Sequence, residues 1–152
     1  MICTDRRLRL SAWLIAALLC FIWGNSLLPG WISESLSIWV RSLLAVVVPP
    51  EASALGEGDG LLRKIAHFAE FAALGACLCW RFGMLEKRKI LALIYSFGAA
   101  CLDETIQMFV PERGPGLRDV AIDTCGAAAG IGVLLLGHTI INHIKQSKEK
   151  TL

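Results

Sequence analysis

Residues 120–141 read VAIDTCGAAAGIGVLLLGHTII, an apolar stretch that contains a single carboxylate side chain. Its length matches an α-helix that crosses a bilayer, for which about 20 mostly apolar residues are needed. Three other mostly apolar stretches of similar length precede it, at residues 8–28, 61–82 and 90–110. The sequence therefore predicts an all-α membrane protein, a bundle of four transmembrane helices.

The composition agrees with this fold class. Of the 152 residues, 55% are hydrophobic and 18% are charged, whereas a soluble domain has about 45–50% apolar and about 25% charged residues. These values argue against disorder and a coiled coil, and a net charge of +2 is too small to favour a nucleic acid as partner. Five of the six cysteines lie in apolar stretches, where free Cys packs as a small hydrophobe, which argues against a disulfide scaffold. We expect one integral membrane domain over residues 1–152.

Small residues recur within the last predicted helix. Gly126 and Gly130 lie four residues apart and therefore on one helix face. In a bilayer, small residues let two helices approach closely, since lipid provides no hydrophobic force between them. We interpret this pattern as helix packing.

The segment between the first two predicted spans contains an amphipathic helix at about residues 31–48. Apolar residues recur there at helical spacing from Ile32 to Val47. The segment contains Trp31 and Trp39, and tryptophan is enriched in the headgroup region of membranes. We expect this interfacial helix to lie along the membrane surface and to cover part of a polar pocket at the outer face.

The basic residues predict the orientation. Ten of the fifteen Lys and Arg residues lie in the N-terminal segment, the 81–89 turn and the C-terminal tail, and five lie on the opposite side. Since cytoplasmic loops carry an excess of Lys and Arg, we expect both termini to be cytoplasmic. The first apolar stretch is long enough to span and no small-residue cleavage site follows it, so we expect a retained helix in a multi-pass protein of the cell membrane.

Polar side chains gather near the outer ends of the second, third and fourth predicted spans. From the helical rise, Asp103 lies about 10 Å below the end of its predicted helix at Val110. By the same arithmetic, Asp123 lies about 7 Å below Arg118. Arg63 and Arg118, at helix starts, are interpreted as side chains that reach lipid headgroups. The polar cluster consists of Lys64, His67, Glu70, Asp103, Glu104, Gln107, Arg113, Asp119 and Asp123.

Two interpretations of this polar cluster remain open. A carboxylate at the bilayer centre costs on the order of 2.5–3.5 kcal/mol, so a group of acids requires a hydrated pocket or basic partners. The cluster is either a functional site or an ion-pair network that only fixes the helix register. In a functional site, His67 is the candidate acid or base, because the reference pKa of histidine lies near neutrality. Asp103 and Glu104 point in different directions, so we expect at most one to face the pocket as strongly as Gln107.

Two other arrangements of these residues are possible. Imidazole and carboxylate ligands for a metal are offered by His67, Asp103, Glu104 and Asp123, although no recognised ligand spacing links them. We therefore assign no metal, and the residues identify no cofactor. Ser26, His67 and Asp103 could form a nucleophile with its base and orienting acid.

The order and spacing of the polar residues resemble the VanZ-like family over three of the four spans. The matching segments are Lys64-Ile-Ala-His67-Phe-Ala-Glu70-Phe71, Asp103-Glu104-Thr-Ile-Gln107, Pro111-Glu112-Arg113 and Arg118-Asp119-Val-Ala-Ile-Asp123-Thr-Cys-Gly126. Asn25-Ser26 and Ser33-x-Ser35 are similar to the family as well. Two positions differ, because the family often has tyrosine where Phe71 stands and glycine where Glu112 stands.

The resemblance implies an integral membrane protein related to the one associated with teicoplanin resistance, and it does not supply a reaction. One function is an enzyme of the outer leaflet that acts on a lipid-anchored or cell-envelope molecule. Its catalytic candidates are His67, Asp103, Glu104 and Asp119. Its candidate substrate-binding residues are Lys64, Glu70, Gln107, Arg113, Asp123, Asn25 and Ser26. Lys64 and Arg113 would hold an anionic group.

The alternative function is a non-catalytic accessory protein that binds a membrane lipid headgroup or a glycopeptide. The same cationic and acidic residues would then serve recognition only. A channel or transporter is disfavoured, since four short spans without a broken helix leave little room for a pathway across the membrane.

Overall fold

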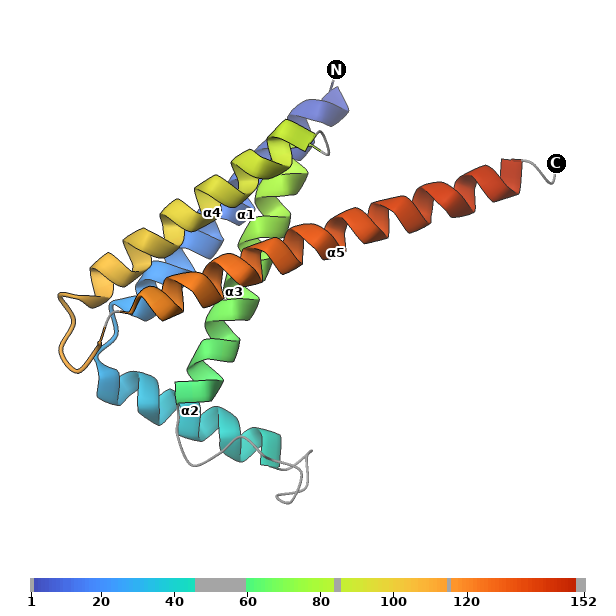
Figure 1. Ribbon diagram of the computed structural model, residues 1–152. Helices are drawn as coiled ribbons and strands as arrows, with labels where there is room; N and C mark the ends of the chain where they lie inside the picture. The colour runs from blue at the N-terminus through green and yellow to red at the C-terminus, as the bar shows by residue number, and fades with distance from the viewer. Residues whose placement is uncertain (1, 46–59, 84–85, 115, 150–152) are drawn as a thin grey trace.

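The structure is a computed structural model that describes residues 2–45, 60–83, 86–114 and 116–149. These residues form five helices and no strand (Figure 1): α1 (Ile2–Ser26), α2 (Gly30–Ala45), α3 (Gly60–Phe82), α4 (Glu86–Gln107) and α5 (Leu117–Glu149). Within the described chain, four helices are long and apolar enough to cross a membrane, over Arg6–Ser26, Leu61–Phe82, Arg88–Gln107 and Leu117–Lys148. The predicted all-α fold with four spans is therefore confirmed.

Two helices end earlier than the sequence predicts. α1 ends at Ser26 rather than at residue 28, and α4 ends at Gln107 rather than at residue 110. After α4, the amide of Val110 donates to the carbonyl of Gln107 in a tight turn, and the following Pro111 has no amide hydrogen with which to continue a helix. Asp103 therefore lies about 6 Å from the end of its helix, closer than the predicted distance of about 10 Å.

α3 is the central helix, and α5 crosses it at close range (Figure 1). A Cβ atom on Gly126 of α5 would overlap the backbone of Phe68 on α3. A Cβ atom on Gly130 would likewise overlap the backbone of Ala72. The interpretation of the two glycines as packing residues is confirmed, because only glycine allows this approach.

An apolar core fills the space between the four spans. It includes Ile22, Phe71, Leu74, Ala92, Ala100 and Ile131, which come from α1, α3, α4 and α5. Most of the buried charged side chains, by contrast, lie near the end of the bundle where α3 and α5 begin.

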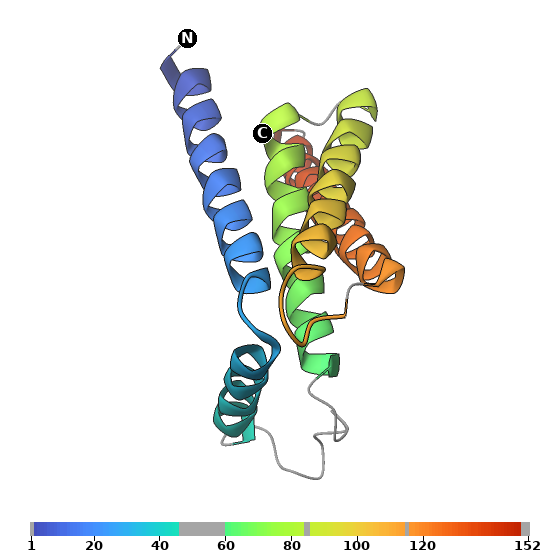
Figure 2. The same ribbon diagram turned by 90° about the vertical axis from the view of Figure 1, so that its left-hand side faces the viewer.

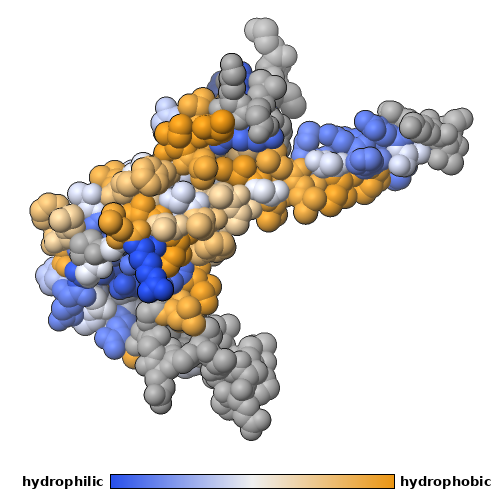
Figure 3. All heavy atoms as spheres, viewed as in Figure 1, coloured by the Kyte–Doolittle hydropathy of each residue, from blue (hydrophilic) through white to orange (hydrophobic). Residues whose placement is uncertain are grey.

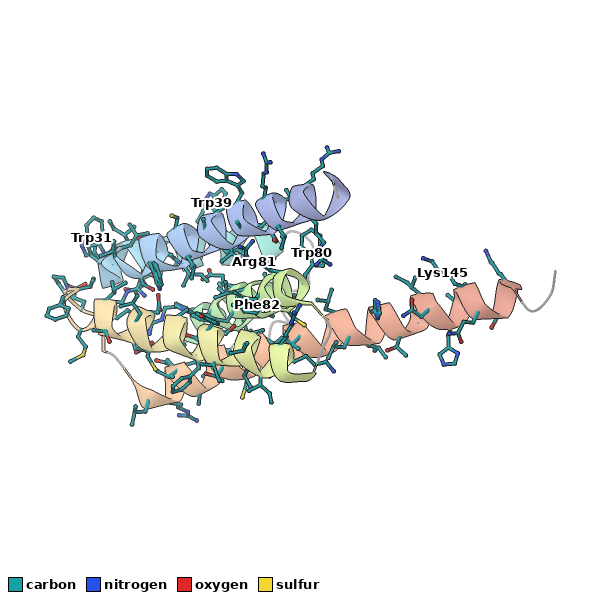
Figure 4. All side chains as sticks on the ribbon, turned by 90° about the horizontal axis from the view of Figure 1, so that it is seen from above. Trp31, Trp39, Trp80, Arg81, Phe82 and Lys145 are labelled. Carbon is teal, nitrogen blue, oxygen red and sulfur yellow. The ribbon has the colours of Figure 1, made fainter. Side chains whose placement is uncertain are left out.

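The spans alternate in direction. The start of α1, the end of α3 and the start of α4 lie at one end of the bundle, and α2 lies at the other (Figure 2). The C-terminal part of α5, which carries Lys145, extends away from the other helices (Figure 4). Side chains there are exposed, and the surface changes from hydrophobic to hydrophilic along this part of α5 (Figure 3).

α2 covers most of the predicted interfacial helix, and residues 46–48 of that prediction lie outside the described residues. The backbone amide of Gly30 donates to the carbonyl of Pro111 at 3.3 Å, which ties the start of α2 to the segment before α5. The side chains of Trp31 and Trp39 are exposed (Figure 4). The position of α2 along a membrane surface stays a prediction.

Candidate functional site

His67 on α3 lies between two carboxylates that come from two other helices. Its Nδ1 atom is 3.7 Å from Oδ2 of Asp103 on α4 and 3.8 Å from Oδ1 of Asp123 on α5. All three side chains are buried, and their nearest ligand atoms lie within 4.8 Å of one another, so the three residues could hold a metal ion. We call these three residues the histidine–aspartate cluster.

The two carboxylates of this cluster have oxygen atoms without a hydrogen-bond partner among the described residues. These atoms are Oδ1 of Asp103 and both oxygens of Asp123. Buried polar groups nearly always have a partner, because an unpaired one loses its hydration without compensation. The distances to His67 are longer than a hydrogen bond, so the imidazole does not satisfy them. The cluster therefore has unused acceptor capacity.

The contact between α3 and α5 explains why Asp123 faces His67. Asp123 and Gly126 are three residues apart and share one face of α5. Phe68 directly follows His67 on α3. Because Gly126 lies against the backbone of Phe68, this face of α5 is held close to this part of α3. A side chain in place of Gly126 would separate Asp123 from His67.

A small polar pocket adjoins the cluster, at the end of the bundle where α3 and α5 begin. Its inner volume is about 10 Å³, which is room for about one water molecule or a single ion. It is lined by Arg63, Lys64, His67, Glu104, Gln107, Asp119, Ile122 and Asp123. The pocket combines cationic side chains from the start of α3 with acidic side chains from α4 and α5. None of the α2 side chains that the structure describes lines it, and the cover of the pocket by this helix stays a prediction.

Gln107 holds Asp103 in its orientation. The amide nitrogen Nε2 donates to Oδ2 of Asp103 at 2.8 Å, and the same atom lies 3.3 Å from Oγ of Ser26 on α1. One buried amide thereby links α1 to α4. Ser26 pairs with Gln107, and no hydrogen bond joins it to His67 among the described residues, so the possible arrangement of Ser26, His67 and Asp103 is not formed.

Asp103 and Glu104 both face the site. Glu104 lines the pocket, and its Oε2 accepts a hydrogen bond from the backbone amide of Gly116 at 2.7 Å. Asp119, in the first turn of α5, is half-buried, and its Oδ1 has no hydrogen-bond partner in the described chain. Of the two adjacent acids only Glu104 lines the pocket together with Gln107, whereas Asp103 lies beside His67, which agrees with the expectation that at most one of them faces the pocket as strongly as Gln107.

Arg113 does not line the pocket. Its Nε donates to the carbonyl of Leu28 at 3.2 Å, and its Nη2 donates to the carbonyl of Asn25 at 3.1 Å. Burial lowers the pKa of its guanidinium below the usual value, although arginine remains protonated at neutral pH. The structure therefore gives Arg113 a role at the end of α1, where helix carbonyls lack partners, in place of the predicted place at the pocket.

Glu70 and Asn25 lie beside the cluster and outside the pocket lining. The side chain of Asn25 is a hydrogen-bond partner of Glu70, whose Oε2 atom is buried and has no partner among the described residues. Arg63 lines the pocket next to Lys64, although its sequence position predicted only a contact with lipid headgroups. A basic residue at the start of a predicted span can either contact lipid headgroups or line a pocket. The sequence of Arg63 and its neighbours is compatible with both roles. Arg118 is exposed.

A comparison with protein families adds one finding. A family model described as VanZ/LLP1 matches residues 11–139. The matched region contains all of the histidine–aspartate cluster and all of the residues that line the polar pocket. No curated protein and no solved structure matches the chain.

Proposed function

The chain belongs to the VanZ/LLP1 family, and from this premise we propose that it is an enzyme of the cell membrane that acts on the anionic headgroup of a lipid-anchored envelope molecule. The observation that carries the proposal is the position of His67 between two buried carboxylates beside a pocket lined by Arg63 and Lys64. This arrangement places groups that can move protons next to groups that can bind an anion.

The location of the pocket supports a lipid as substrate. The pocket lies near the start of two membrane-spanning helices, α3 and α5, which is the depth at which headgroups meet the hydrocarbon region. The excess of Lys and Arg in the N-terminal segment, the 81–89 turn and the C-terminal tail supports a cytoplasmic position of the end of the bundle where α1 begins and α3 ends. By this rule the pocket opens to the outer leaflet, where envelope precursors are exposed.

The charge distribution supports an anionic headgroup. Arg63 and Lys64 lie in adjacent positions near the start of α3, and both line the pocket. Guanidinium and ammonium groups bind phosphate and carboxylate oxygens through charge-assisted hydrogen bonds. Arg113, which we expected to contribute, lies outside the pocket lining and uses Nε and Nη2 for the carbonyls at the end of α1, while its buried Nη1 has no partner among the described residues. The anion therefore binds at Arg63 and Lys64.

The acids of the pocket support a reaction on that headgroup. An oxygen atom of the headgroup, or a water molecule, would enter the pocket beside the histidine–aspartate cluster. Asp119 can take up the proton that such an oxygen releases, because its Oδ1 atom has no partner among the described residues. His67 can carry the proton as well, because a ring nitrogen of imidazole can accept a proton and release it again.

A receptor that binds the same headgroup without turnover is the second candidate. The observation that favours it is the inner volume of about 10 Å³, which is too small to enclose a headgroup. Such a protein would hold the anion at Arg63 and Lys64 and leave the buried acids unused. The phenotype implied by the resemblance, tolerance of teicoplanin, fits either candidate.

Lipid analysis separates the two candidates. Full-length protein is reconstituted in vesicles that contain phosphatidylglycerol and a lipid-linked cell-wall precursor, and the lipids are followed by mass spectrometry. We expect a new product, which His67→Ala abolishes and His138→Ala, on the exposed surface of α5, does not. Lipid that co-purifies with the wild-type protein without conversion supports the receptor. Equal conversion by His67→Ala contradicts the proposed role of the cluster. Teicoplanin tolerance of cells that express the same variants is a second readout.

A further inference from the structure

We propose that His67, Asp103 and Asp123 bind a divalent metal ion. The inference goes beyond the proposed function, because binding of an ion can be measured whether or not a lipid is converted. It rests on three observations that concern the geometry, the unpaired atoms and the surroundings of the cluster.

The geometry is that of side chains that converge on one point without bonding to each other. Nδ1 of His67 is 3.7 Å from Oδ2 of Asp103 and 3.8 Å from Oδ1 of Asp123. These distances are too long for hydrogen bonds. They are close to the separation of two ligand atoms that share one ion, since each ligand lies about 2.0–2.4 Å from a bound metal. A small inward movement of the side chains would complete the coordination.

The unpaired atoms belong to the two aspartates. Both oxygens of Asp123 and Oδ1 of Asp103 have no hydrogen-bond partner in the described chain, and both side chains are at least 99% buried. Two unpaired carboxylates at this depth would repel each other. A divalent cation would accept their free electron pairs and balance their two negative charges, with neutral imidazole as the third ligand.

The surroundings match those of a metal site. Nε2 of Gln107 donates to Oδ2 of Asp103 at 2.8 Å, and an outer contact of this kind orients a ligating carboxylate. The adjoining pocket, with its inner volume of about 10 Å³, leaves space for a water molecule on the open side of the ion. Three protein ligands and an open position are typical of ions that take part in a reaction.

The ligand set selects the class of ion. Calcium and magnesium prefer oxygen ligands only, whereas imidazole together with carboxylates suits manganese, iron and zinc. We therefore assign the site to a first-row divalent ion, for which Mn²⁺ and Zn²⁺ are the probes. With the ion bound, His67 is a ligand, Asp119 remains to accept a proton, and the open position could receive an oxygen of the anionic headgroup.

The test measures the ion directly. Full-length protein in lipid nanodiscs is stripped with a chelator, incubated with Mn²⁺ or Zn²⁺, freed of excess ion and analysed by elemental mass spectrometry. We expect one ion per chain in the wild-type protein and a matching change in the Mn²⁺ paramagnetic resonance spectrum. His67→Ala and Asp123→Asn should each weaken binding by more than about tenfold. The matched controls are His138→Ala on α5 and Glu112→Gln, whose side chains are exposed.

Several results overturn the inference. It fails if the wild-type protein retains no ion, or if His67→Ala and Asp123→Asn retain as much ion as the controls. Folding of each variant is checked by helical circular dichroism, and a variant that does not fold is replaced by Asp103→Asn or His67→Gln. Lipid conversion by wild-type protein that retains no ion after incubation with Mn²⁺ or Zn²⁺ overturns the metal site and leaves the proposed function intact. Stoichiometric binding of an ion without conversion supports the metal site and counts against the enzyme.

Discussion

Gly126 on α5 lies directly against the backbone of Phe68 on α3, with no space for a side chain between them. This contact lies one residue after His67 on α3 and three residues after Asp123 on α5. The closest approach of the two helices and the candidate site are therefore parts of one structural unit. Gly126 has no reactive side chain, yet its close contact with Phe68 sets the distance between His67 and Asp123.

Replacement of Gly126 by alanine should damage both the packing and the site. The added methyl group must push α5 away from α3, which should lower stability by about 1–3 kcal/mol, as overpacking does in other cores. The separation of Asp123 from His67 should increase, with loss of metal binding. Unfolding in detergent checks the first effect, and elemental analysis checks the second.

Gly132→Ala is the matched control for this prediction, because nothing lies within 4 Å of the Cβ position of Gly132 on the same helix. Alanine is a better helix former than glycine by about 1 kcal/mol, so this variant should be as stable as the wild type or more stable. Equal behaviour of the Gly126 and Gly132 variants would show that the close contact with Phe68 has no energetic role.

Arg113→Ala should act mainly through stability. Its guanidinium donates to the carbonyls of Asn25 and Leu28 at the end of α1, and its loss leaves these acceptors without that donor. Hydrogen bonds to a charged group contribute about 1.5–3 kcal/mol, so the loss should be of that order. Arg113→Lys should rescue it only in part, since an ammonium group cannot reproduce the planar contact.

Thermal unfolding of the full-length protein in detergent measures this effect, with Arg118→Ala as the control because Arg118 is exposed. An unchanged unfolding temperature together with weaker headgroup binding would restore Arg113 to the role of anion ligand that the sequence suggests.

Glu112→Gly should leave the protein as stable as the wild type or more stable. Glu112 has a φ of 61°, in the left-handed region where side chains other than glycine are strained by about 1–2 kcal/mol. The greater freedom of glycine in the unfolded chain opposes this gain by about 0.4–1 kcal/mol, so the net increase should be at most about 1.6 kcal/mol. Chemical unfolding measures it.

The same replacement within a helix serves as the comparison. Glu34 is exposed on α2, and Glu34→Gly should lower helix stability by about 1 kcal/mol or less. If both glycine variants are destabilised to the same degree, the backbone conformation of Glu112 carries no strain.

Cysteine labelling tests the orientation. In a background without the native cysteines, a cysteine introduced at Gly114 should react with an impermeant reagent in intact cells, because Gly114 is exposed in the segment between α4 and α5. A cysteine introduced at Arg88, exposed near the start of α4, should react only after permeabilisation. The opposite pattern would place the polar pocket at the cytoplasmic face.

The four spans can be read from the residues alone, because the length of an apolar stretch reflects the thickness of the bilayer and does not depend on neighbouring helices. The sequence also placed His67, Asp103 and Asp123 at one level, since helical rise converts residue numbers into depth. Which atoms come into contact depends on how the helices pack against one another. Arg63 lines the pocket and Arg113 does not, Glu104 pairs with the amide of Gly116, and Asp123 faces His67. These relationships follow from the crossing of α3 and α5 and from the turn after Gln107, and the rotation of one helix against another is set by side chains far apart in the sequence.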